Sequence, residues 1–245
     1  MALTRDSLFL GGMTFVVELA RPLEIPYDFA DGILARSTMF DKSKTWMAPR
    51  ADDALDREIK LNLWLRSDDD AYALSVTPSG IEMTWVRPEP TPQELREDVD
   101  DDAIRERLHA MLDMVLRALP DGVPAVEQSR EWFTPDPNAG QTLAAMFVRD
   151  EFHEHVRGTD GLRLHFETAA EPDDGDARDT LRFLATKVDL QGEEVTGIRV
   201  QSKRELRALS DAEPLDLDTI TGFFACVNAD AAAYMDTTLQ WGDAG

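Results

Sequence analysis

The sequence lacks the cysteines that a disulfide bond within the chain would need. Cys226 is the only cysteine among the 245 residues. It lies in the apolar pattern of residues 223–227, which favours a small buried hydrophobe over a nucleophile, because no histidine lies near it in the sequence. A chain of this length can bury a substantial core without disulfides or metals. The scarcity of cysteine is therefore consistent with a reducing, cytoplasmic location.

Long apolar runs are also missing. A membrane-spanning helix needs about 18 or more consecutive apolar residues, and no segment of this sequence approaches that length. The best N-terminal candidate, residues 8–17, contains two glycines and follows Asp6 rather than a basic segment. It predicts a strand, not a signal peptide. We expect a soluble protein with no membrane partner.

Positive charge is scarce. The chain carries 25 Lys and Arg against 48 Asp and Glu, which gives a formal net charge of −23. Such a surface repels nucleic-acid phosphates, so we expect no direct binding to DNA or RNA. It would attract a basic protein. The same composition is also typical of a salt-rich or GC-rich source, where acidity serves solubility and predicts no partner.

Known catalytic motifs are absent as well. The sequence has no Walker-type loop, no dinucleotide fingerprint and no nucleophile elbow. The acidic runs at 68–70 and 98–102 lack the glycine-containing ligand spacing of a calcium loop. Gly11-Gly12 is an isolated pair that indicates at most a turn or a bulge. We therefore predict no catalytic residue and no cofactor.

Strand patterns of period two dominate the first half. Residues 59–65 alternate apolar and polar side chains, and residues 72–76 and 81–85 continue the pattern. A charged turn at 67–70 and a turn at 78–80 separate them. These runs predict an antiparallel meander with one buried face. An earlier strand is predicted at 13–19.

Helical patterns of period three to four close each half. Apolar residues recur over 104–119, and again over 219–240, where Asp218 is the predicted N-cap. Between these helices, strands are predicted at 162–168, 180–190 and 195–203. The chain is thus predicted to be α+β, with an antiparallel sheet and helices on one face. Strands followed by a helix occur twice, which suggests a duplicated unit with halves at 1–122 and 123–245, although the halves can pack as one domain.

Three histidines form the only local concentration of metal-type ligands: His153, His155 and His165. If 146–157 is a strand and 159–161 a three-residue hairpin loop, all three share one face. A two-residue loop would send His165 to the other face. If 143–157 is a helix, His153 and His155 lie about 200° apart. Because few registers bring them together, we predict no metal site; His109 is predicted to be a partly exposed helical residue.

Trp64 and the acidic turn after it are the predicted interaction residues. Trp64 faces away from the apolar side of its strand and therefore needs a second layer, a ligand or a partner. Asp68, Asp69 and Asp70, together with a second acidic loop at 171–179, could form a patch for a basic protein. The sequence therefore favours a non-enzymatic interaction protein: an adaptor, an assembly subunit or an inhibitor of a basic partner. The alternative is a metal-dependent hydrolase that uses the His153, His155 and His165 region.

Overall fold

A computed structural model describes most of the chain. The described residues are 3–4, 7–20, 29–36, 38–41, 45–49, 61–77, 79–88, 94, 99–116, 122–148, 162–170, 176–210 and 213–243. Within them, nine strands form a single sheet in the order β2-β3-β4-β5-β1-β6-β9-β8-β7. The strands are β1 (Phe9–Glu18), β2 (Trp46–Pro49), β3 (Leu61–Arg66), β4 (Tyr72–Thr77), β5 (Gly80–Val86), β6 (Ala125–Pro135), β7 (Arg163–Ala170), β8 (Asp176–Leu190) and β9 (Glu193–Arg207).

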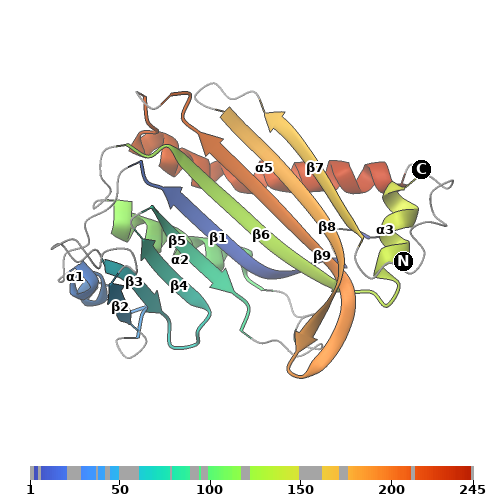
Figure 1. Cartoon of the computed structure of the whole chain (residues 1–245), viewed down its shortest axis with the longest axis horizontal. Coiled ribbons are helices and arrows are strands. Elements are labelled where there is room, and N and C mark those ends of the chain that lie inside the picture. The colour runs from blue at the N-terminus through green and yellow to red at the C-terminus, as the bar shows by residue number, and fades with distance from the viewer. Residues whose placement is uncertain are drawn as a thin grey trace.

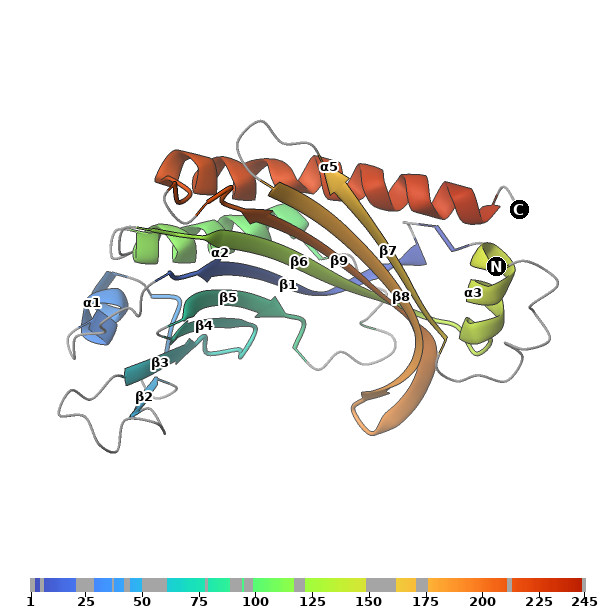
Figure 2. The ribbon, with the colours of Figure 1, turned by 45° about the horizontal axis from the view of Figure 1, so that its top comes forward.

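The main helices lie together on one face of this sheet (Figures 1 and 2). They are α2 (Asp101–Leu116), α3 (Ala139–Phe147) and α5 (Leu217–Asp243), while the short helix α1 (Phe29–Arg36) lies near β2 and β3. No helix within the described residues combines the length and apolar character that a membrane crossing requires. The predicted fold class, α+β with helices on one face of an antiparallel sheet, is confirmed.

The predicted meander of the first half is present as β3, β4 and β5. These strands pair antiparallel, with Leu63 opposite Val76 and Val76 opposite Ile81. All three side chains are fully buried on the helix-covered face. Residues 59 and 60 lie outside the described residues. The period of two therefore placed the buried face correctly wherever it can be checked.

The two halves of the chain follow the same course. Each begins with a strand in the centre of the sheet, continues through a helix and a three-stranded meander, and ends in a helix. The central strands β1 and β6 pair antiparallel, so that β5 and β9 flank them on either side. Both halves thus share one sheet. β2 is an additional strand at the edge of the first half.

Two apolar cores lie between the sheet and its helices. The larger one joins β1 and the β3–β5 meander to α2 and the start of α5, where Phe15 and Phe224 stack with ring centroids 4.5 Å apart. The smaller one joins β8 and β9 to α3 and the end of α5, through Leu143, Phe183 and Leu239. Trp132 contacts both cores.

A polar seam interrupts the covered face between the two cores. It consists of side chains from β6, β9 and β8, namely Gln128, Arg130, Ser202, Arg204 and Asp179. The Arg130 guanidinium lies 3.2 Å from the Asp101 carboxylate at the start of α2, and Arg204 lies 3.7 Å from Asp179. The amide group of Gln128 is buried without a hydrogen-bond partner. The seam therefore carries polar groups where the flanking positions on both sides are apolar.

Helix α3 corrects the prediction for residues 143–157. A strand beginning at 146 is wrong, because Met146 and Phe147 are helical; a helix continuing to 157 is also wrong, because the backbone is extended at Val148. Asp136 starts the helix, where its carboxylate accepts hydrogen bonds from the Asn138 amide at 2.7 Å and the Thr142 hydroxyl at 2.6 Å. Residues 149–161 lie outside the described residues.

Aspartates cap the two longer helices. The Asp100 carboxylate accepts a hydrogen bond from the Ala103 amide at 2.9 Å at the start of α2. At the start of α5 the same role falls to Asp216, which accepts from the Thr219 amide at 2.7 Å. The predicted N-cap, Asp218, is wrong by two residues. It lies in the first helical turn, where its charge suits the helix dipole.

His109 joins α2 to both the sheet and α5. Its ring meets Phe15 edge-on at 5.4 Å, and the side chain is half-buried, as predicted. Burial and the charge of Arg105 hold its pKa below the ordinary value, although the Asp113 charge and a hydrogen bond to the Phe224 backbone act in the opposite direction. The folded protein therefore favours the neutral imidazole.

We predict that Leu63→Ala lowers the free energy of unfolding by about 2–5 kcal/mol, the usual cost of truncating a buried leucine. Guanidinium-induced unfolding measures it. The control is Ser75→Ala on the opposite face of the next strand, which should cost less than about 0.5 kcal/mol. A small loss for Leu63→Ala would show that the covered face is assigned wrongly.

The second prediction concerns pH. The unfolded-state pKa of histidine is about 6.5, and the folded-state pKa of His109 is lower, so the unfolded chain binds the proton more readily below that pH. Stability should therefore fall as pH drops from 7.5 to 5.5, and His109→Gln should remove part of that fall. The measurement is guanidinium unfolding of both proteins at each pH. An equal loss of unfolding free energy in the two proteins would contradict the lowered pKa of His109.

Candidate functional site

The candidate site lies on the face of the sheet opposite the helices. In each strand, the side chains that alternate with the buried ones point to this uncovered face. Across the five strands from β5 to β8, one row runs through Thr84, Thr14, Ser129, Lys203 and Thr180, each residue pairing with the next. The uncovered face is therefore polar along its centre.

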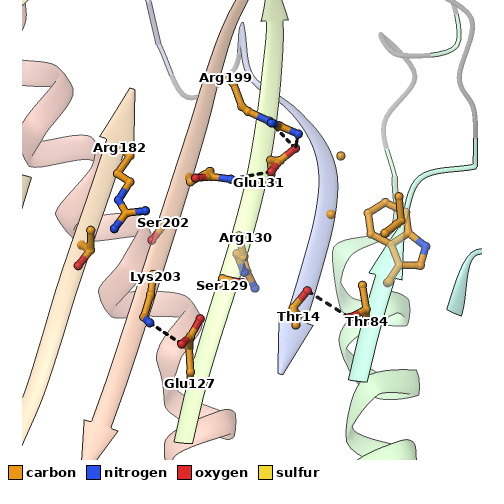
Figure 3. Close-up of a pocket in the computed structure, with 16 residues that line it drawn as sticks. Thr14, Thr84, Glu127, Ser129, Arg130, Glu131, Arg182, Arg199, Ser202 and Lys203 are labelled. Atoms are coloured by element: carbon orange, nitrogen blue, oxygen red, sulfur yellow. Dashed lines mark hydrogen bonds and ion pairs between the residues drawn. The ribbon is translucent and has the colours of Figure 1, made fainter. Parts of the chain in front are cut away.

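A groove of about 540 Å³ follows the centre of the uncovered face (Figure 3). Its floor is low because the central strands carry small residues there: Gly12, Thr14 and Ser129. The Thr14 and Thr84 hydroxyls lie 3.4 Å apart across β1 and β5. The register between β1 and β6 shifts between Leu10 and Gly12, so of the two interpretations of Gly11-Gly12, a turn or a bulge, the structure favours the bulge. We call this hollow the sheet groove.

Ion pairs between β6 and β9 line one side of the sheet groove (Figure 3). Arg199 approaches the Glu131 carboxylate to 2.6 Å, and Gln201 donates to the same carboxylate at 2.9 Å. Further along the same two strands, the Lys203 ammonium of β9 lies 2.5 Å from the Glu127 carboxylate of β6. These carboxylates are therefore neutralised by their own sheet.

Lys203 also contacts Glu205, at 3.2 Å. Burial lowers the pKa of the Lys203 ammonium, but the hydrogen bonds and charges of Glu127 and Glu205 outweigh burial and raise that pKa overall. For Glu205, burial raises the pKa, and the contacts with Lys203 and Arg207 outweigh it and lower that pKa. The Lys203 ammonium and the Glu205 carboxylate are thus held in their charged forms. Neither is available as a general acid or base near neutral pH.

The long hairpin of β8 and β9 bends away from the helices at its closed end (Figure 2). Its two-residue turn, Gln191 and Gly192, has positive φ at both positions, as a tight hairpin turn requires. At the bend, a Cβ on Gly197 would overlap the Phe133 ring and the Thr134 carbonyl. Phe133 and Leu190 are buried together there. Only glycine fits at position 197 without a shift of the backbone.

Within the part of the chain that the structure describes, Arg182 lines the sheet groove without an ion pair. It is exposed, and no dashed line reaches it in Figure 3. Its cross-strand neighbour on β7 is His165, which is also exposed. Arg163, two residues before His165, points to the same face. Two arginines and a histidine thus lie close together at this end of the uncovered face.

Trp64 lies on the uncovered face, at the other end from Arg182. Its neighbours Leu63 and Leu65 are fully buried, whereas Trp64 is half-buried, so the predicted direction of its side chain is confirmed. It pairs with Ser75 on β4 and with Trp46 on β2. On the same face, Val86 is 51% exposed, which makes it one of the most exposed large hydrophobic residues in the described chain.

The acidic turn at 67–70 joins β3 to β4, as predicted, and Asp68, Asp69 and Asp70 are exposed. Asp69 has a structural part, since its carboxylate accepts from the Ser67 hydroxyl at 2.6 Å and the Ala71 amide at 3.1 Å. The hydrogen bond from Ser67 is the largest cause of a lowered Asp69 pKa. Asp70 has a φ of +57°, in the left-handed region.

The same turn borders a second cavity, of about 610 Å³, on the side of α2. Met39 and Met114 give this cavity an apolar wall, and Asp68 and Asp69 give it an acidic rim. Arg107 also lines it and lies 5.2 Å from the centre of the Tyr72 ring.

The second predicted acidic loop does not adjoin the first. Residues 171–175 lie outside the described residues, and 176–179 belong to β8, so this part is a strand and not a loop. Ala177 lies in the row of Leu206, Val126 and Val17. Leu63 on β3 lies in this same row, and the turn at 67–70 lies beyond the other end of β3. The described part of the second acidic segment, residues 176–179, therefore lies at the opposite strand ends from the turn at 67–70.

The histidine cluster cannot be assembled from the described residues. His153 and His155 lie outside them, and His165 is exposed on β7. Within the described part of the chain, no group of three His, Cys, Asp or Glu side chains is placed to hold a metal ion. The backbone of Cys226 belongs to α5.

Comparison with known proteins adds no relative. No protein-family model matches the sequence, and no curated protein matches it. The evidence for function therefore comes from the geometry of the uncovered face.

The sheet groove was not predicted from the sequence. A signal for one side of it was present: residues 199–207 place polar side chains at every second position, which indicates a polar strand face. The other side of the groove is formed by β6, which was not predicted as a strand. The groove also depends on which strands are neighbours, and the strand order is not encoded in any single segment.

Proposed function

We propose that this chain is a non-enzymatic interaction protein that binds a partner protein on the uncovered face of its sheet. The observation that carries the proposal is the one-sided cover of the sheet: helices protect one face, while the other presents a broad surface of half-buried side chains. A sheet face of this kind is usually covered by another layer.

The docking surface is proposed to centre on Trp64. We define the Trp64 patch as Trp64, Ala73, Ser75, Thr84 and Val86, which lie on the uncovered face of adjacent strands β3, β4 and β5. This patch combines an aromatic ring, an exposed aliphatic side chain and small hydroxyl groups, and the exposed Glu82 lies at its border, opposite Ser75. Interface centres are typically enriched in aromatic residues and depleted in charge.

The charged half of the uncovered face is a weaker candidate for the centre of the docking surface. From β6 to β8, the carboxylates Glu127, Glu131 and Glu205 are matched by basic side chains from the same sheet. Such pairs are already satisfied and add little affinity for a partner. The Trp64 patch is therefore the better candidate for the energetic centre of an interface.

The partner is proposed to be basic, on the grounds of the net charge of −23. The acidic turn at 67–70 directly follows β3, the strand that carries Trp64. Its charges would lie at the rim of the Trp64 patch, where charge accelerates association more than it adds affinity.

We also propose that the two halves descend from one duplicated unit. The shared order of elements in each half, and their symmetric placement about β1 and β6, support it. The two halves then differ in what they place on the uncovered face. The first half carries the Trp64 patch, and the second half carries ion pairs and arginines.

A photo-crosslinking amino acid at position 75 tests the docking surface, because Ser75 is the cross-strand neighbour of Trp64. In the native host, we expect a protein adduct at position 75. We expect none at position 217, since Leu217 is 53% exposed but lies in the helix layer. Trp64→Ala should reduce the adduct at least fivefold, as truncating an interface anchor does. Equal yields at 75 and 217 would contradict the proposal.

The acidic rim is tested with the partner so obtained. Replacing Asp68, Asp69 and Asp70 together by Asn should slow association about three- to tenfold at low salt and much less above the salt that screens charge. The turn should persist, because an Asn side chain still offers an oxygen acceptor at 69 and tolerates the left-handed backbone at 70. Stopped-flow mixing at two salt concentrations measures the rate.

The matched control is Glu193→Gln, an exposed acid at the tip of the β8–β9 hairpin. The association rate of the Glu193→Gln variant with the partner should stay within twofold of the rate of the unmodified protein. If the triple variant also leaves the rate unchanged at low salt, the acidity serves solubility and not the partner.

A further inference from the structure

Within the described residues, Arg182 and Arg163 differ from the other basic residues of the uncovered face because no carboxylate lies within ion-pair distance of either. The other basic side chains of this face include Arg66, Arg178, Arg199, Lys203 and Arg207, and each has a carboxylate within 4.0 Å. The chain has 48 acidic residues for 25 basic ones, so pairing should be easy. Arg182 instead projects into the sheet groove without one (Figure 3).

The neighbours of Arg182 add positive charge and hydrogen-bond donors. His165 is directly opposite on β7, and Arg163 lies on the same face of that strand. On β9, Gln201 is the other cross-strand neighbour, and Thr180 lines the groove beside Arg182 on β8.

The sheet groove beside these groups is large enough for a small molecule. Its volume of about 540 Å³ falls in the range of about 300–1,000 Å³ that small-ligand sites occupy. The guanidinium group presents a planar fork of donors that matches the oxygens of a carboxylate or phosphate. The hydroxyls of Thr14, Thr84 and Ser129 also line the groove, together with the carboxylates of Glu127 and Glu131, which are already paired with basic side chains.

We propose that the sheet groove binds a small ligand through an oxyanion, a phosphate or a carboxylate group, held by Arg182. Arg163 adds positive charge at that end, His165 adds a ring nitrogen, and the hydroxyl floor accommodates the body of the ligand. The anion-binding end of this site lies apart from Trp64, although Thr84 and Val86 belong both to the sheet groove and to the Trp64 patch. Arg182 and Trp64 are separated by six inter-strand steps, or roughly 29 Å at about 4.8 Å per step.

The test is a titration of the full-length protein with inorganic phosphate and, separately, with acetate, at constant ionic strength maintained with sodium chloride. Backbone amide signals in ¹H–¹⁵N NMR spectra report binding. We expect saturable shifts on β8 and β9 near Arg182. Tighter binding of phosphate identifies a phosphate-bearing ligand, and tighter binding of acetate identifies a carboxylate.

Two variants complete the test. Arg182→Gln should weaken binding of the preferred anion at least tenfold. Arg66→Gln is the matched control, since Arg66 lies on the same face but is paired with Asp70; it should bind the anion within twofold of the original. Both arginines are exposed, so both variants should fold.

Two results would overturn the proposal. One is the absence of saturable shifts with either anion below about 20 mM. The other is unchanged binding in Arg182→Gln, which would show that the shifts arise elsewhere. Because Trp64 does not line the sheet groove, Trp64→Ala should leave anion binding intact, so failure of the anion site and failure of the partner surface can be told apart.

Discussion

The antiparallel pairing of β1 with β6 is the contact on which the architecture depends. These two strands begin the two halves of the chain, and their pairing makes one sheet out of two meanders. The bulge at Gly11-Gly12 interrupts this pairing without ending it. A bulge increases local twist and re-aims the neighbouring side chains. The low floor of the sheet groove lies on this central pair, so the pairing that unites the halves also positions the candidate site.

Strict alternation along the strands then decides what each face can do. The covered face collects Phe15, Leu63 and Ile198, which are fully buried beneath helices. The uncovered face collects hydroxyls, carboxylates and arginines, which stay partly hydrated. Most charges on that face neutralise each other between adjacent strands. The chain is strongly acidic as a whole, yet its uncovered face is locally balanced between β6 and β9, and positively charged near Arg182.

The sequence predicted the elements whose buried side is uniformly apolar. The meander of β3, β4 and β5 and the helix α2 show this pattern. β8 and β9 show it towards their hairpin turn, beyond the polar seam formed by Asp179, Ser202 and Arg204. β6 was missed for a physical reason: its covered positions include Gln128 and Arg130, which belong to the polar seam, so no apolar alternation marks the strand. Helix α3 was misplaced because apolar residues recur every four positions from Ala144 onward, beyond the point where the helix ends at Phe147.

The candidate site was harder to predict than the fold. Trp64 and the acidic turn belong to one continuous segment, and the local pattern was enough to place them on the surface. The sheet groove draws residues from β1, β5, β6, β8 and β9, so it exists only once the strand order is fixed. Asp69 also differs from the expectation of a purely electrostatic role, because its carboxylate holds the turn together.

The polar seam has a consequence for how the protein unfolds. Since it divides the covered face, the apolar contacts of the two cores are joined mainly through Trp132 and through α5, which passes over both. Cooperative unfolding depends on continuous buried contact, and a break in that contact allows one part to open before the rest. The smaller core, with α3 and the last turns of α5, therefore forms a separate unit of local opening. Its transient loss would release the C-terminal end of the chain while the larger core stayed folded.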